Sequence, residues 1–255
     1  MFLFEGEQDL NAVTKAECLK NAMINQLYHK TTEVLNKRDL DLKELSSFAD
    51  LEKRVLLLIA IMSVESRCMR KVVNKNTNAT GIMQLTPICV KEIKNKAKLT
   101  VNLTNVKSSV EGGIVYINLC YNYFKNKESL KKNWNTWTDL QKLNAVMYAY
   151  NAGPYGIINK ISADGYDPSS VGYSDDIVIM MNYFQDPKNL ENLKKEIKKD
   201  VVAKKIIAKK IADKKQKIEA PKAAAQKAES KLYLYQDSLV TETFLRQTIL
   251  KNLLK

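Results

Sequence analysis

The stretch LEKRVLLLIAIMSVES, residues 51–66, has apolar side chains at nearly every position from Val55 to Val64. A helix that is apolar on most sides is surrounded by core, so this stretch predicts a central buried helix. It ends in Glu65 and Ser66, and burial raises the pKa of a carboxyl group because it disfavours the charged form. Glu65 could then donate a proton near neutral pH. Alternatively, Glu65 only marks where the helix reaches solvent, and the stretch taken alone favours this second interpretation.

A second motif, GIMQLTP at residues 81–87, follows the Asn-rich loop NKNTNAT. Gly81 permits close approach of the backbone, because glycine has no side chain. Met83 offers an adaptable apolar wall, and Gln84 offers both a donor and an acceptor of hydrogen bonds. These properties suit a sugar-binding cleft. Taken alone, GIMQL could equally be the start of an ordinary helix.

A third motif, MYAYNAGP, occupies residues 147–154. The preceding residues, LQKLNAVMYAY, predict a helix, and the Gly-Pro pair after it is a typical signal for a helix C-terminus. One interpretation is a helix cap without a chemical role. The functional interpretation is that Tyr150 and Asn151, at the end of this helix, face a cleft.

The three motifs in this order resemble the soluble lytic transglycosylase family, whose domain is similar to goose-type lysozyme. The family's Glu-Ser, Gly-hydrophobic-Met-Gln and Ala-Tyr-Asn-Ala-Gly signatures are intact at residues 65–66, 81–84 and 149–153. The segment SVEGGIVYI, residues 109–117, is similar to a family helix that reads Asn-Ile-x-x-Gly-x-x-Tyr-Leu, with Ser109 in place of the Asn. The resemblance covers roughly residues 48–186.

Two segments depart from the family pattern. The loop CMRKVVNKNTNAT, residues 68–80, lacks the Phe-Asn-Pro stretch that is frequent in the family. The segment GYSDDIVIMMNYF, residues 172–184, is a poor match to the Glu-Thr and Tyr-Val pairs that often follow the third motif. We therefore carry over no substrate contact from the family to that last segment.

The resemblance implies an enzyme that cleaves the β-1,4 bond between N-acetylmuramic acid and N-acetylglucosamine in peptidoglycan glycan strands. Glu65 would be the only catalytic acid and base, and the product would carry a 1,6-anhydro ring. Ser66 would help to hold the substrate or intermediate. The cleft would be lined by Gln84, Tyr150 and Asn151, with Met83 in its wall. The resemblance implies no metal and no cofactor.

Two other functions stay open. A muramidase would use the same fold but a water nucleophile, and an inverting hydrolase needs a second carboxylate about 6.5–9.5 Å from the first. Asp139, Asp175 and Asp176 are available, although none lies in a signature motif. The other alternative is a non-enzymatic structural or ejection protein of a virion that keeps a lysozyme-like module.

The charge of the chain is unevenly distributed. The formal net charge is +13, and residues 188–231 contain fifteen lysines against six acidic residues. Such a segment can be a solvated helical extension, or it can attract an anionic wall or membrane surface or dock on virion assembly partners. Nucleic acid suits the same charge, but we do not expect it as a partner.

The sequence predicts a mainly α fold of the lysozyme-like α+β superfamily, in which the sheet is small or absent. Any sheet should lie between Arg67 and Thr80. We expect a helical leader at residues 1–47, a catalytic domain at 48–187 and a basic helical extension at 188–255. Apolar residues recur at helical spacing in the leader, and its packing partner stays open.

The remaining residues with reactive side chains indicate no further chemistry. The four cysteines are far apart and fit no metal-ligand spacing, so we expect buried free thiols. The single histidine, His29, lies in a polar stretch and is expected to be a solvated surface residue. The first residues, MFLFEGEQD, do not read as a secretory signal. We therefore expect a phage protein that reaches the wall from the host cytoplasm or on the virion.

Overall fold

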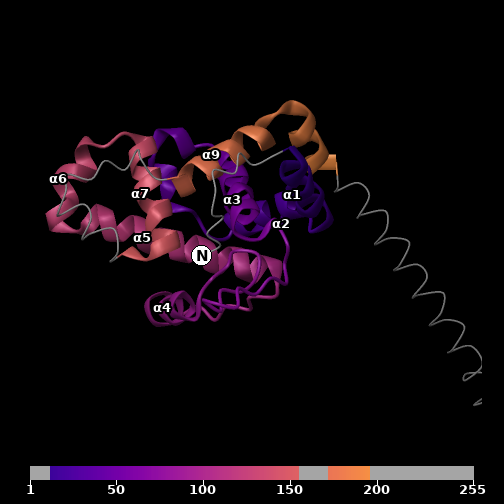
Figure 1. Ribbon diagram of the computed structural model, residues 1–255. Coiled ribbons are helices and arrows are strands. Elements are labelled where there is room, and N and C mark those ends of the chain that lie inside the picture. Colours follow the sequence, from indigo (N-terminus) through magenta and orange to yellow (C-terminus); the bar gives the residue numbers. More distant parts are fainter. Residues whose placement is uncertain (1–11, 155–171, 196–255) are drawn as a thin grey trace, which may run out of the picture. The chain divides into compact units, whose positions relative to one another are not determined.

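The computed structural model describes residues 12–154 and 172–195, and the helices of this part are shown in Figure 1. All of these residues belong to one compact unit, residues 1–197. The described helices and 3-10 turns are α1 (Ala12–Ile24), α2 (Leu27–Leu35), η1 (Asp41–Glu44), η2 (Ser46–Phe48), α3 (Leu51–Ser66), α4 (Pro87–Ala97), α5 (Val106–Asn126), α6 (Glu128–Thr136), α7 (Asp139–Ala152) and α9 (Gly172–Gln185). Residues 187–195 are also helical. The fold is mainly α, as predicted.

Helix α3 is the central element of the core, and the predicted helix at residues 51–66 is confirmed. Asp50 caps its start, because its side chain accepts hydrogen bonds from the backbone N–H groups of Glu52 and Lys53. Every residue from Val55 to Ser63 is buried. The helix packs chiefly against α9 and α2, with further contacts to α1. This dense packing fixes the direction in which the end of α3 points.

The leader packs on the core of the described unit. The sequence alone had not decided whether it packs there or on a partner. Cys18, Ala22 and Leu27, from α1 and α2, are completely buried. The amides of Asn21 and Asn25 donate hydrogen bonds to the carbonyls of the two residues that follow α3, at 2.9 and 2.8 Å. The leader therefore holds residues 67 and 68, which follow Glu65 and Ser66, in place. The predicted division at residues 47 and 187 stays a prediction.

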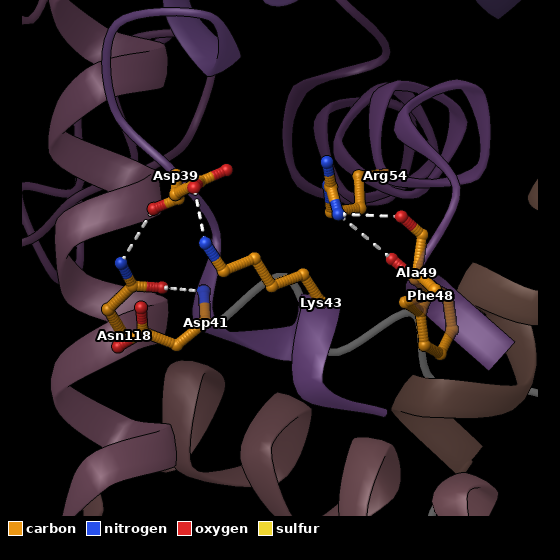
Figure 2. A network of polar contacts seen from close by, with 7 residues as sticks. All are labelled: Asp39, Asp41, Lys43, Phe48, Ala49, Arg54 and Asn118. Carbon is orange, nitrogen blue, oxygen red and sulfur yellow. Dashed lines mark hydrogen bonds and ion pairs between the residues drawn. The ribbon is translucent and has the colours of Figure 1, made fainter. Parts of the chain in front are cut away.

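A polar network holds the connection between the leader and α3, as Figure 2 shows. The side chain of Asn118, on α5, donates to the carbonyl of Asp39 at 2.9 Å and accepts from the backbone N–H of Asp41 at 2.8 Å. Arg54 donates to the carbonyls of Phe48 and Ala49 at 3.3 and 2.9 Å. The connection is thereby tied to α5 on one side and to α3 on the other.

The sheet was predicted to be small or absent, and among the described residues its place is taken by two isolated antiparallel bridges. Val73 pairs with Thr80, and Thr80 pairs with Leu85. The described residues contain no longer strand. The second bridge extends beyond the interval in which we expected a sheet. The bridges bring the loop after α3 beside the start of α4.

The cysteines follow the prediction, and the histidine does not. All four cysteines are buried free thiols. The prediction of a solvated His29 is wrong: its ring is half-buried, meets the Tyr28 ring edge-on at 5.5 Å, and has a buried Nε2 atom without a hydrogen-bond partner among the described residues. Burial lowers the pKa of His29, so the neutral form is favoured.

Helices that could span a bilayer are not found among the described residues. The predicted basic extension lies almost wholly outside the described residues, since these end at residue 195.

Candidate active site

Glu65 lies in the last turn of α3, where the buried helix ends. The residue is half-buried, and the protein around its carboxyl group displaces solvent from it. Burial raises its pKa to about 7, because loss of solvent disfavours the charged carboxylate. At neutral pH both the acid and its conjugate base are therefore well populated. This is the property that a group needs when it first donates and later accepts a proton.

Tyr173, the second residue of α9, donates a hydrogen bond from its hydroxyl to Oε1 of Glu65. This bond favours the charged carboxylate and so opposes the effect of burial on the pKa of Glu65. Burial and the nearby Glu65 charge hold the pKa of Tyr173 far above its ordinary value. Tyr173 therefore remains a protonated donor, and it fixes the orientation of the carboxyl.

Ser66 ties the end of α3 to the second motif. Its hydroxyl lies 2.9 Å from the carbonyl of Met62, one turn back in α3, and 2.8 Å from the carbonyl of Ile82. The side chain is buried. In this position Ser66 holds the loop of the second motif against α3, and a direct contact with substrate stays a prediction.

The second motif forms a tight turn, and α4 begins only at Pro87. The interpretation of GIMQL as the start of a helix is therefore wrong. Gly81 has φ +82°, and a Cβ atom there would lie 2.1 Å from the carbonyl oxygen of Leu103. Only glycine tolerates both constraints, because it has neither a Cβ atom nor a penalty for positive φ. Gly81 thereby sets the close approach of the motif to the loop before α5.

Gln84 is held in the same turn with one hydrogen-bonding atom unused. Its φ is 45°, in the left-handed region. Its Nε2 atom donates to the carbonyls of Gly81 and Val72, at 2.8 and 3.1 Å. Its Oε1 atom is buried and has no partner among the described residues. A fixed, unused acceptor of this kind suits an N–H or O–H group of a ligand.

The third motif is joined to the second by Tyr150. Its hydroxyl donates to the carbonyl of Met83 at 2.6 Å, and its ring meets Tyr116 edge-on at 5.7 Å. Tyr150 and Met83 are both buried, and Met83 packs over Gly113 of α5. Asn151, one residue further along α7, is exposed. Their roles as cleft residues stay predictions.

The structure thus links Ser66, Met83, Gln84 and Tyr150 through the backbone of the second motif. Ser66 bonds to Ile82, and Tyr150 bonds to Met83, the next residue. Tyr173 is the site residue that we did not predict. The available signal was the tyrosine of GYSDD, at the place where the family has its Tyr-Val pair.

The segment that contains the three motifs is similar to a known protein domain. Residues 50–170 match the Transglycosylase SLT domain. The matched segment begins at the residue that caps α3 and includes Glu65 and all three motifs. The match supports a transglycosylase-type enzyme with peptidoglycan as its class of substrate. A comparison with curated proteins finds no match to the chain.

Two further features concern the surroundings of the SLT domain. Tyr173 lies three residues beyond the matched segment, so the residue that donates a hydrogen bond to Glu65 comes from outside it. Within the described ranges, no group of three or more His, Cys, Asp or Glu side chains is placed to hold a metal ion.

Proposed function

We propose that the chain is a lytic transglycosylase that cleaves the bond between N-acetylmuramic acid and N-acetylglucosamine, with Glu65 as the only acid and base. The observation that carries the proposal is the raised pKa of Glu65, about 7, at the end of the helix where the SLT segment has its Glu-Ser motif. A carboxyl group with an ordinary pKa would be almost fully ionised at neutral pH and a poor acid.

The reaction takes place in two steps. Protonated Glu65 donates its proton to the glycosidic oxygen, and the bond from that oxygen to C1 of the muramic residue breaks while its 2-acetamido group assists. The Glu65 carboxylate then accepts the proton of the C6 hydroxyl, whose oxygen forms a new bond to C1. Glu65 ends in its starting state, and no water molecule is consumed.

The other residues orient the two reacting partners. Tyr173 holds the carboxyl of Glu65 through its hydrogen bond. The unused Oε1 acceptor of Gln84 binds an N–H or O–H group of the sugar. Tyr150 fixes the backbone of the turn next to Gln84 through the Met83 carbonyl. Exposed Asn151 contacts the glycan strand from the end of α7.

The described surroundings of Glu65 support ring closure, because they offer no carboxylate that is coupled to it. Among the described residues, no carboxylate contributes to the raised pKa of Glu65. Asp139 is engaged elsewhere, since its side chain accepts hydrogen bonds from the hydroxyl of Ser46 and the backbone of Ser47. Asp176 perturbs Tyr173 and not Glu65. Digestion of purified sacculi and mass analysis of the products test the proposal, because anhydro ends are one water lighter than reducing ends.

Replacing Tyr173 with Phe should lower the rate of glycan cleavage roughly tenfold, about the value of a hydrogen bond to a charged group. It should also raise the pKa of Glu65, because the lost bond favours the carboxylate. The acid form then persists to higher pH, so the alkaline limb of the kcat/KM profile should move upward. The pH profile on soluble glycan strands measures both effects.

The control for this variant is Tyr183→Phe on the same helix, where the ring packs beside Phe184 at 5.6 Å. Tyr183→Phe should leave the position of the alkaline limb unchanged. An alkaline limb that stays in place in Tyr173→Phe as well would show that Tyr173 does not set the protonation of Glu65.

A further inference from the structure

One part of the chain, residues 67–98, is far more basic than its length would suggest. We call it the basic lobe. It comprises the loop after α3, the turn of the second motif and α4. It contains a single acidic residue, Glu92, and eight basic residues: Arg67, Arg70, Lys71, Lys75, Lys91, Lys94, Lys96 and Lys98. An eighth of the chain thus carries a net charge of +7, separate from the lysines of residues 188–231.

Most of these cations are exposed and are not neutralised by neighbours. Arg67 lies 3.7 Å from Glu17, and Lys96 pairs with Glu92 on the same helix. Within the described part of the chain, the other six basic residues take part in no ion pair, and all six are exposed. Such a concentration of one sign attracts an anionic partner.

The same lobe exposes large apolar side chains. Ile88 is 77% exposed, Val73 is 56% exposed and Met69 is 40% exposed. These are three of the six large hydrophobic residues with marked exposure among the described residues. An exposed apolar patch among charges is typical of an interaction surface.

Helix α4 has an exposed face and a buried face. Ile88 and Lys91 are exposed three residues apart on one face of the helix, and the exposed Lys98 follows as its C-cap. Cys89 and Ile93 are buried on the other face. The bridges from Val73 to Thr80 and from Thr80 to Leu85 bring the basic loop beside the start of this helix. The cations and the apolar residues therefore belong to one region.

We propose that the basic lobe binds the surface of a bilayer that contains anionic phospholipids. An anionic polymer in water would need the cations but would gain nothing from exposed Ile88, Val73 and Met69. A bilayer interface uses both, because the lysines approach the headgroups while the apolar side chains enter the acyl boundary. The lobe adjoins Glu65 through Ser66, so binding would hold the active site next to a membrane.

Sedimentation with vesicles tests this proposal on the full chain. Vesicles of phosphatidylcholine mixed with phosphatidylglycerol should bind the protein at low salt, and vesicles of phosphatidylcholine alone should bind it much more weakly. The lobe variant Lys91→Gln, Lys94→Gln, Lys98→Gln should weaken binding by up to about 100-fold, since each lysine near an anionic surface contributes about fivefold. Ile88→Ser should weaken it by about fivefold or more.

Matched variants separate the lobe from net charge and from general hydrophobicity. Lys20→Gln, Lys53→Gln, Lys127→Gln removes three exposed lysines outside the lobe, and Val13→Ser removes a 76% exposed side chain from α1. Both should bind as the unmodified chain does. The lysines after residue 187 are the same in every variant, so their contribution cancels.

Three results would overturn the proposal. Equal losses in the lobe and control variants would mean that only net charge matters. Equal binding to the two kinds of vesicle would exclude anionic lipid as the partner. Loss of binding with the lysines but not with Ile88→Ser would mean that the lobe is held to the vesicles by charge alone and that its apolar side chains do not enter the bilayer.

Discussion

Replacing Glu65 with Gln should reduce glycan cleavage in purified sacculi by at least about 10²–10⁴-fold, which is the usual contribution of general acid–base catalysis. Glutamine keeps the shape of the side chain and can still accept the hydrogen bond from Tyr173, but it cannot donate or accept the transferred proton. Release of soluble muropeptides over time measures the loss.

The fold should survive this substitution. The carboxyl of Glu65 makes the folded protein less stable as the pH rises. The pKa of Glu65 is about 7 in the folded protein, above its ordinary value of 4.5. Its contribution to stability is therefore fully present below pH 4.5 and is lost as the pH rises to about 7. Glu65→Gln should match the unmodified protein at pH 4 and melt at a higher temperature at pH 8.

Glu111→Gln is the matched control for the catalytic effect. Glu111 is a partly exposed glutamate on α5 that pairs with Arg38 at 2.9 Å. A surface pair of this kind contributes little to stability, so the control should cleave sacculi at the normal rate. Normal cleavage by Glu65→Gln would exclude Glu65 as the acid and base.

Replacing Gly81 with Ala should lower the free energy of unfolding by about 3–5 kcal/mol, because two penalties act together. The residue has φ +82°, and the new Cβ atom would lie 2.1 Å from the Leu103 carbonyl oxygen, which is a backbone atom. The turn must then move, and it carries Gln84 with it. Urea unfolding measures the loss of stability, and cleavage of sacculi should also fall.

Gly153→Ala isolates the backbone penalty. Gly153 has φ +83°, but no atom of the described residues lies within 4 Å of the position of its added Cβ. The Gly153→Ala substitution should lower the free energy of unfolding only by the strain of the backbone, about 1–3 kcal/mol. If Gly81→Ala were no more destabilising than Gly153→Ala, the close approach between Gly81 and Leu103 would have no energetic importance.

The features that the sequence predicts well are those encoded in a single segment. The bounds of α3 follow from the apolar run and from Asp50 as its cap. The end of α7 follows from Gly153 and Pro154. The raised pKa of Glu65 was only one of two interpretations of this stretch, and burial at the end of α3 decides in its favour. Each of these depends on local periodicity, capping and burial.

Features that depend on contacts between distant segments were missed. Tyr173 is 108 residues from Glu65, and only the packing of α9 on α3 brings them together. His29 has polar neighbours in sequence, but the fold half-buries its ring. The docking of Asn21 and Asn25 on the end of α3 is likewise tertiary. The roles of Ser66, Met83, Gln84, Tyr150 and Asn151, and the phage setting, stay predictions.

Digestion of sacculi in water labelled with heavy oxygen distinguishes ring closure from hydrolysis. Ring closure should give muropeptides with anhydro-muramic ends that are one water lighter than reducing ends and carry no label, because the C6 hydroxyl and not water attacks C1. Glu65→Gln should release neither product. Reducing ends that carry the heavy oxygen would exclude ring closure and would identify a muramidase on the same fold.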